Sequence, residues 1–191
     1  MILEALVTTE NVDGRPHLSA IGPHVDHQLR RWQLKPFNSS QTFANLRRTN
    51  RCIIHVTDDV SLLTACVCGD KEQIEFEFDP AVGFLLPAAC RSFALQIESW
   101  EVSDPRSTAT ASLVRVIEQR PFFGWNRGKH GILELAIAAT RIEWLTAGQI
   151  EAAIALADDL VAKTGGEAEH AALERLRDFV RQRVAAKRPA G

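Results

Sequence analysis

The chain has 191 residues, of which 46% are hydrophobic and 24% are charged, so it can bury a substantial core and lacks the composition of a disordered protein. Its formal net charge of −2 argues against a nucleic-acid partner, because nucleic-acid-binding modules are usually strongly basic. No run approaches the roughly 20 apolar residues of a membrane span, and Glu4 interrupts the apolar start before a secretory signal forms, so no membrane partner is expected.

The first part of the chain is predicted to be mostly β-strand. Residues 3–9 are apolar and β-branched, and residues 10–16 are dense in turn formers, so a hairpin to a second strand from His17 follows. Residues 29–37 suit a third antiparallel strand.

The next segment alternates short helices and strands. Ser40 suits the N-cap of a helix over residues 41–48, and the apolar residues 52–57 suit a strand. A second short helix is expected over residues 60–68, ending at Gly69.

Two long strands are predicted near the middle of the chain. Residues 91–102 and 108–118 have strand composition and are separated by a turn, so they are expected to close a barrel. Residues 70–89 are interrupted by proline and glycine, and we interpret them as irregular.

The last third of the chain has the hydrophobic spacing of helices. Apolar residues recur every three or four positions over residues 132–145, and Thr146 and Gln149 have the spacing of a capping box that begins a second helix. A third amphipathic helix is expected over residues 167–185, before a loose tail at 187–191. Strands come first and helices last, which indicates the α+β class.

The most informative stretch lies at a predicted strand-to-helix junction. The first N–H groups of a helix are unpaired and carry partial positive charge, so a phosphate at Ser39 and Ser40 gains backbone and hydroxyl donors together. Thr42 and Asn45 lie three residues apart and therefore share one helix face. The plainer alternative is that Ser40 only caps the helix while Thr42 and Asn45 are solvated.

Several short motifs, in this order, resemble the flavin reductase-like FMN-binding split-barrel superfamily, and a branch of it with a helical C-terminal extension. They are Asp13-Gly14-Arg15-Pro16-His17-Leu18-Ser19, the pair Pro36-Phe37, the pattern Ser40-x-Thr42-x-x-Asn45-Leu46, and the strand over residues 52–56. The similarity covers residues 3–57 well, and residues 120–141 resemble the branch's C-terminal motif. It implies a homodimer with an antiparallel split β-barrel over residues 1–123 and a helical segment over residues 124–187, packed on the barrel or on the partner.

The resemblance also implies that FMN is the cofactor. In the superfamily the Ser-x-Thr helix start binds the FMN phosphate, and the strand after the first hairpin lays its backbone along the flavin ring. Carried over, the phosphate residues are Ser39, Ser40, Thr42 and Asn45, and the ring residues are Ser19, Ala20, Ile21 and Gly22. The stretch from Lys35 to Asn45 is expected to cradle the phosphate, so Lys35 and Phe37 are cofactor-binding candidates as well. A glycine suits the ring position because its missing side chain lets a ring approach closely. His55 departs from the pattern, since many relatives have Asn there.

Two further clusters contain residues that could bind a ligand. His24, Asp26 and His27 are metal-ligand types, but on a strand His27 points away from the other two, so no metal is expected. Asn126 and Arg127 precede an apolar helix, where either a second anion site or a plain helix cap fits.

The cysteines indicate a reducing compartment. Cys52, Cys66, Cys68 and Cys90 lack the paired C-x-x-C spacing of a zinc site and the density of a disulfide scaffold. We interpret them as reduced core cysteines of a cytoplasmic protein.

No Ser-His-Asp, paired-carboxylate or Cys-His arrangement is apparent, which fits a protein whose chemistry comes from a cofactor. The resemblance implies a flavoprotein oxidoreductase that passes hydride between a reduced nicotinamide or deazaflavin-like donor and a small organic acceptor. The alternatives are a binding protein for flavin, heme or a pterin without turnover, and a structural dimer without a cofactor, and fold alone does not decide among them.

Overall fold

The computed structural model describes residues 1–187, which form two compact units. One unit consists of Met1–Thr57 and Glu75–Phe122, and the other of Asp58–Ile74 and the chain from Phe123 onward. The predicted domain boundary at residue 123 stays a prediction, and the structure adds Asp58–Ile74 to the helical unit. The predicted α+β class is confirmed, with the sheet in the first unit and most helices in the second.

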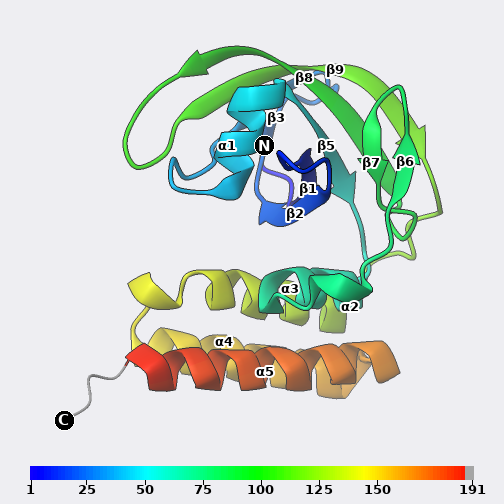
Figure 1. The fold of residues 1–191 in the computed structure, drawn as a ribbon. Helices are drawn as coiled ribbons and strands as arrows, with labels where there is room; N and C mark the ends of the chain where they lie inside the picture. The colour runs from blue at the N-terminus through cyan, green and yellow to red at the C-terminus, as the bar shows by residue number, and fades with distance from the viewer. Residues whose placement is uncertain (188–191) are drawn as a thin grey trace. The chain divides into compact units, whose positions relative to one another are not determined.

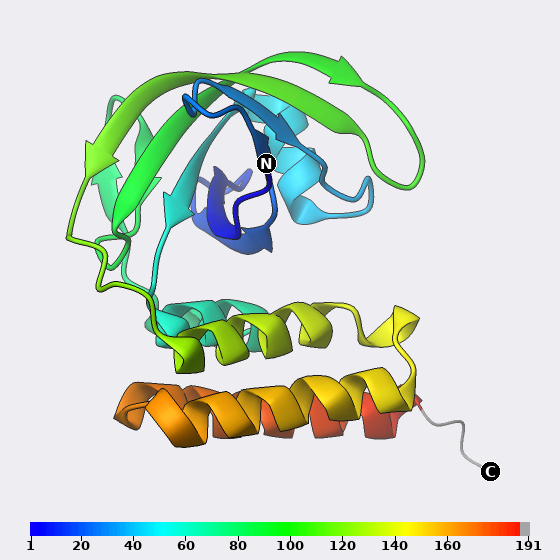
Figure 2. The same ribbon diagram turned by 180° about the vertical axis from the view of Figure 1, so that it is seen from behind.

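Seven antiparallel strands form the curled sheet of the first unit (Figures 1 and 2). They are β1 (Ala5–Glu10), β2 (Pro16–Ile21), β3 (His24–Val25), β4 (Arg31–Leu34), β5 (Arg51–Val56), β8 (Arg91–Glu101) and β9 (Thr108–Glu118). Their order across the sheet is β2-β1-β5-β8-β9-β4-β3, so β2 and β3 are its edge strands.

Most of the predicted strand pairing is confirmed. β1 and β2 form the expected hairpin, in register from Ala5 opposite Ile21 to Glu10 opposite Pro16, and β8 and β9 form the expected long pair. The third predicted strand is shorter than expected, and it pairs with β3 and β9, not with the first hairpin. After β4, Phe37 makes a single bridge to Arg106.

Helix α1 (Gln41–Thr49) lies within the curl of the sheet, under the arch of β8 and β9 (Figure 1). Alternation along β4 buries Trp32 and Leu34 and exposes Arg31 and Gln33. Trp32 packs against Phe93 of β8, with ring centroids 5.0 Å apart, and Leu46 of α1 joins the same core. This shared core fixes the position of α1 against the sheet.

Residues 70–89 are more regular than the sequence suggested. They contain the short turn η1 (Lys71–Gln73) and a hairpin of β6 (Glu77–Asp79) and β7 (Gly83–Leu85). The ring of Phe84 packs against those of Phe76 and Phe78, with centroids 6.5 and 5.0 Å away. The prediction of an irregular segment was wrong. It rested on the proline and glycine residues, which usually interrupt regular structure, whereas packing among the three phenylalanine rings accompanies a hairpin here.

The second unit contains α2 (Val60–Cys68), α3 (Arg127–Thr140), η2 (Ile142–Trp144), α4 (Ala147–Thr164) and α5 (Glu167–Lys187). The predicted start of α4 is confirmed, because Thr146 and Gln149 form both hydrogen bonds of a capping box. The predicted end of α2 is also confirmed, since Gly69 adopts the left-handed conformation there. Of the predicted tail, residues 188–191 lie outside the described residues.

Buried apolar side chains from all four helices form the core of this unit, among them Val60, Ile132, Val161 and Leu176. No helix within residues 1–187 is both long and apolar enough to cross a membrane.

Candidate functional site

The start of α1 is built by a serine cap. The Oγ atom of Ser40 accepts a hydrogen bond from the N–H of Phe43 at 3.1 Å and donates one to the carbonyl of Phe37 at 2.7 Å. A serine has one O–H group, so this hydroxyl has no further hydrogen to donate to a ligand. The structure therefore supports the capping alternative for the side chain of Ser40.

Asn45 is buried and holds α1 against β1. Its Nδ2 atom donates to Thr9 Oγ1 at 3.0 Å and to Asn11 Oδ1 at 2.9 Å, and its Oδ1 atom accepts from Gln41 Nε2 at 2.8 Å. Only 1% of Asn45 is exposed, so it is neither solvated nor open to a ligand. Its role in the described chain is to position the helix.

A direct hydrogen bond joins the predicted phosphate and ring segments. Thr42 Oγ1 and Ser19 Oγ lie 2.7 Å apart, so α1 and β2 meet at these two hydroxyls. Whichever hydroxyl accepts this bond keeps its own O–H free to donate elsewhere. The pair therefore offers one donor where the two segments meet.

The remaining donors at this end of α1 suit an anion. The N–H groups of Gln41 and Thr42 are in the first turn of the helix, and no acceptor among residues 1–187 pairs with them. Ser39 and Lys35 are exposed close by in the chain. Unpaired helix N–H groups, a hydroxyl and a lysine are the donor set that a phosphate needs, so the residues present fit that group.

The predicted ring segment lies on an edge strand. β2 pairs only with β1, so some of its backbone N–H and C=O groups are directed away from the sheet. Ser19 lies opposite Val7 and Ile21 opposite Ala5, both core residues, whereas the intervening Ala20 is exposed.

Gly22 follows β2 and is also exposed, but the structure gives a local reason for this glycine. A Cβ atom there would lie 3.2 Å from the side chain of Ile2, which is tighter than ordinary contact. A larger residue at this position would therefore require Ile2, which is itself exposed, to shift by a few tenths of an ångström.

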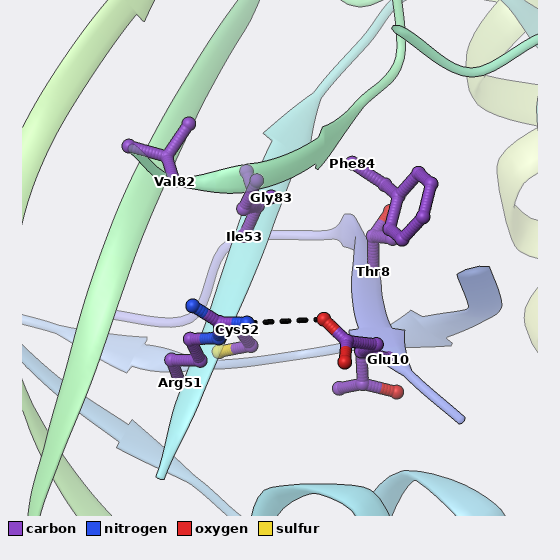
Figure 3. A pocket seen from close by; sticks show the side chains of 9 residues that line it. Thr8, Glu10, Arg51, Cys52, Ile53, Val82, Gly83 and Phe84 are labelled. Atoms are coloured by element: carbon purple, nitrogen blue, oxygen red, sulfur yellow. Dashed lines mark hydrogen bonds and ion pairs between the residues drawn. The ribbon is translucent and has the colours of Figure 1, made fainter. Parts of the chain in front are cut away.

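Two hollows lie on the first unit, and the larger is open. It measures about 360 Å³ and is a depression beside the start of α1, lined by Asn11, Val12, Asp13 and Gln41. The smaller, about 20 Å³, lies between β1, β5 and the β6–β7 hairpin, where Figure 3 shows Phe84 beside Thr8. Ligand pockets usually enclose roughly 300–1,000 Å³, so the smaller hollow is too small for a flavin ring, and the larger has enough volume but offers an open surface and not an enclosure.

His55 is fully buried and lies in a network of neutral groups. Its Nε2 atom is 2.8 Å from Thr8 Oγ1, and its Nδ1 atom is 2.7 Å from Ser92 Oγ. The Nε2 atom of Gln119 donates to the carbonyl of Leu86. This bond orients the amide so that Oε1 of Gln119 faces the hydroxyl of Ser92 and accepts its hydrogen. Ser92 therefore donates to Gln119 and accepts from Nδ1–H of His55, and Thr8 donates to Nε2.

This environment keeps the imidazole uncharged. Burial lowers the pKa of His55 from 6.5 to about 3. Because both ring nitrogens are spent inside the sheet and the side chain is 0% exposed, His55 does not contact a ligand. The difference from relatives that have Asn at this position therefore concerns packing inside the sheet and not a ligand contact.

The histidines near β3 do not gather into a metal site. Within residues 1–187, no group of three His, Cys, Asp or Glu side chains is arranged to hold a metal ion. Asp26 accepts a hydrogen bond from the N–H of Arg30 at 2.8 Å, and this bond lowers the pKa of its carboxyl group. Its carboxylate closes a turn before β4.

Asn126 and Arg127 belong to the helical unit. Asn126 caps α3 by accepting from the N–H of Lys129 at 3.0 Å, and it donates to the carbonyl of Thr164 at 2.9 Å. The N–H of Gly128 is paired with the hydroxyl of Thr164. These first-turn donors are occupied, so the structure supports the helix-cap alternative, and Arg127 is an exposed residue beside the cap.

Sequence reasoning missed one element of this region. Asn38 ties the segment before α1 to the loop between β8 and β9: its Oδ1 accepts from the N–H and the hydroxyl of Ser107, and its Nδ2 donates to the carbonyl of Ser103. Arg106 from the same loop lies over the ring of Phe37. These partners are more than 60 residues apart in the chain, and no local pattern indicates such a contact.

Two family models match the chain. Residues 3–120 match the N-terminal domain of a protein of unknown function, DUF447, and residues 126–178 match the C-terminal model of the same family. No curated protein matches the chain.

Similar solved structures include flavin-binding proteins. An FMN-bound DUF447 protein from Methanosarcina mazei is 21% identical, with a TM-score of 0.81 over 93% of this chain and 94% of that one. A flavin reductase complexed with NADP+ is 12% identical, with a TM-score of 0.54 over 64% and 83% of the two chains. An FMN-binding protein from Thermus thermophilus with bound 1-cyclohex-2-enone is also 12% identical, with a TM-score of 0.53 over 62% and 72%. These likenesses confirm the flavin reductase-like split-barrel fold with a helical C-terminal part.

Proposed function

This chain belongs to the DUF447 family, and we propose that it is a flavoprotein that binds FMN. The observation that carries the proposal is the FMN-bound DUF447 protein, whose fold matches 93% of this chain at a TM-score of 0.81. The start of α1 supports it separately, because its unpaired N–H groups and nearby hydroxyls suit a phosphate.

The structure refines which residues would hold the cofactor. The phosphate would be held by the N–H groups of Gln41 and Thr42, together with Ser39 and Lys35. The ring would lie along the free edge of β2, whose backbone groups are available to it. Ser40 and Asn45 would act indirectly, by fixing the helix start.

We further propose an oxidoreductase role. Bound FMN would supply hydride-transfer chemistry, while the chain binds and orients the reactants. Backbone N–H groups on an edge strand are suitable donors for negative charge on a reduced ring. The donor would be a reduced nicotinamide, as the NADP+ complex of a similarly folded flavin reductase supports, or a deazaflavin-like molecule as the alternative. The cyclohexenone complex of the Thermus protein supports a small organic acceptor.

A homodimer would complete the site. The larger hollow beside α1 is open, and the ring strand β2 has a free edge, so a second copy would supply the missing wall. The four free cysteines of the chain support a cytoplasmic location, where thiols stay reduced.

Anaerobic reduction tests the oxidoreductase proposal. Protein loaded with FMN is mixed with NADH, NADPH or a reduced deazaflavin, and the loss of flavin absorbance is followed over time. Reduction by one donor faster than that of the same concentration of free FMN is expected. Reduction no faster than that of free FMN with all three donors would contradict the enzyme and favour a flavin-binding protein without turnover. Light scattering on the same sample tests the dimer, because the mass of a single chain would contradict it.

A further inference from the structure

The loop between β8 and β9 is fastened to the segment that leads into α1. The N–H of Asn38 donates to the carbonyl of Pro105 at 3.0 Å, and the side chain of Asn38 bonds to Ser103 and Ser107 at 2.8 to 3.0 Å. Phe37 and Arg106 also form a β-bridge. The backbone of Arg106 is therefore held beside the helix start.

The side chain of Arg106 is fixed by stacking and not by a carboxylate. Its guanidinium carbon lies 3.7 Å from the centre of the Phe37 ring. Some other arginines of the same unit are paired with carboxylates, such as Arg51 with Glu10 at 3.0 Å and Arg115 with Asp79 at 3.1 Å. Within residues 1–187 no carboxylate pairs with Arg106, although the residue is exposed.

An arginine held in this way is prepared to bind an anion. Stacking uses the face of the planar guanidinium and leaves the N–H groups at its edge unspent. Those N–H groups form a fork that matches two oxygens of a phosphate, and the stacked ring reduces the conformational freedom lost on binding. The guanidinium stacks on the ring of Phe37, and the backbone carbonyl of the same residue accepts a hydrogen bond from the Ser40 hydroxyl that caps α1. The residue that supports the charge therefore also contacts the helix start that is proposed to bind the phosphate.

We propose that Arg106 is the residue that selects the phosphorylated flavin, FMN, over uncharged riboflavin by binding the terminal phosphate. This inference rests on the proposed function, because it assigns a further residue to the same site. The local sequence around Arg106 is an ordinary turn, and the assignment depends on the packing of its loop against Phe37 and Asn38.

Titration of FMN and riboflavin into three purified full-length proteins tests the inference. Arg106→Gln removes the charge and the fork, and Arg47→Gln is the matched control, because Arg47 also stacks on an aromatic ring, Trp100, but near the end of α1. Arg106→Gln is expected to weaken FMN binding about 10- to 100-fold and to change riboflavin binding by less than about twofold. Arg47→Gln is expected to change neither by more than about twofold.

Three results would overturn the inference: FMN affinity unchanged by Arg106→Gln, an equal loss for both flavins, or an equal loss of FMN affinity in Arg47→Gln. Arg106→Lys, which keeps the charge without the fork, is a second variant, and an FMN preference equal to that of the wild type would likewise contradict bidentate binding. A wild-type protein that binds no FMN refutes the proposed function itself, whereas tight wild-type binding with an unaffected Arg106→Gln refutes only this inference.

Discussion

Acidification is expected to destabilise the first unit through one buried residue, His55. The folded chain keeps its imidazole neutral, with a pKa of about 3, while the unfolded chain protonates it below about pH 6.5. Between these values the unfolded state binds more protons, so stability rises with pH. The contribution is complete above pH 6.5 and is lost as the pH falls toward 3.

The magnitude follows from the pKa difference. Each pKa unit corresponds to about 1.4 kcal/mol, so at pH 4.5 the free energy of unfolding is lower by about 3 kcal/mol, and by about 4 kcal/mol near pH 3, where the folded imidazole is itself half protonated. Three carboxyl groups with lowered pKa values lose their stabilising effect only below about pH 4.5, where the unfolded chain protonates them; they are Asp26, Asp70 and Glu169. The range from pH 6.5 to 4.5 therefore separates His55 from them.

Urea unfolding of the wild type and of His55→Asn at several pH values between 7 and 4.5 measures the effect. The variant is expected to be less stable at pH 7, because it disrupts the bonds to Thr8 and Ser92, and to lose less stability on acidification. The difference between the two proteins is expected to shrink by about 3 kcal/mol over this range. Parallel loss of stability in both proteins would refute the reasoning.

Three further predictions concern stability and thiol reactivity. Asn45→Ala is expected to lower the free energy of unfolding by about 2–4 kcal/mol, because three polar neighbours lose their partner; a loss below about 0.5 kcal/mol in urea unfolding would contradict this. A thiol reagent is expected to label Cys68 in the native protein before Cys52, whose pKa burial raises to about 12; mass spectrometry that finds the reverse order would contradict it. Glu169→Gln is expected to lower the free energy of unfolding by about 1–3 kcal/mol, because it leaves the half-buried Lys129 without its carboxylate partner. Asp159→Asn, in an exposed pair, is expected to lower it by less than about 0.5 kcal/mol. Equal losses for the two variants in urea unfolding would be evidence against this prediction.

Local chemistry made much of the fold predictable. Ser40, Thr146 and Gly69 are residues whose side chains, or lack of one, fix helix ends within a few positions, and the structure has helix ends at all three. The apolar runs of β8 and β9 are long enough to indicate their pairing without distant information.

The site was less predictable, because its contacts join distant segments. The solvated alternative for Thr42 and Asn45 is wrong, because partners in β1, β2 and the turn between them bury both side chains. The contact between Phe37 and Arg106 depends on how the β8–β9 loop folds back, which no local spacing encodes. Sequence therefore located the helix start, and the structure identified which of its groups remain free.

The measurement that tests the central claim most directly is a titration of the purified chain with FMN, followed by flavin fluorescence and by the absorbance of the ring. Saturable binding, one FMN per chain with micromolar or tighter affinity, is the predicted result. Fluorescence and absorbance that remain those of free FMN at every protein concentration would contradict the account and leave the start of α1 as a capped helix end.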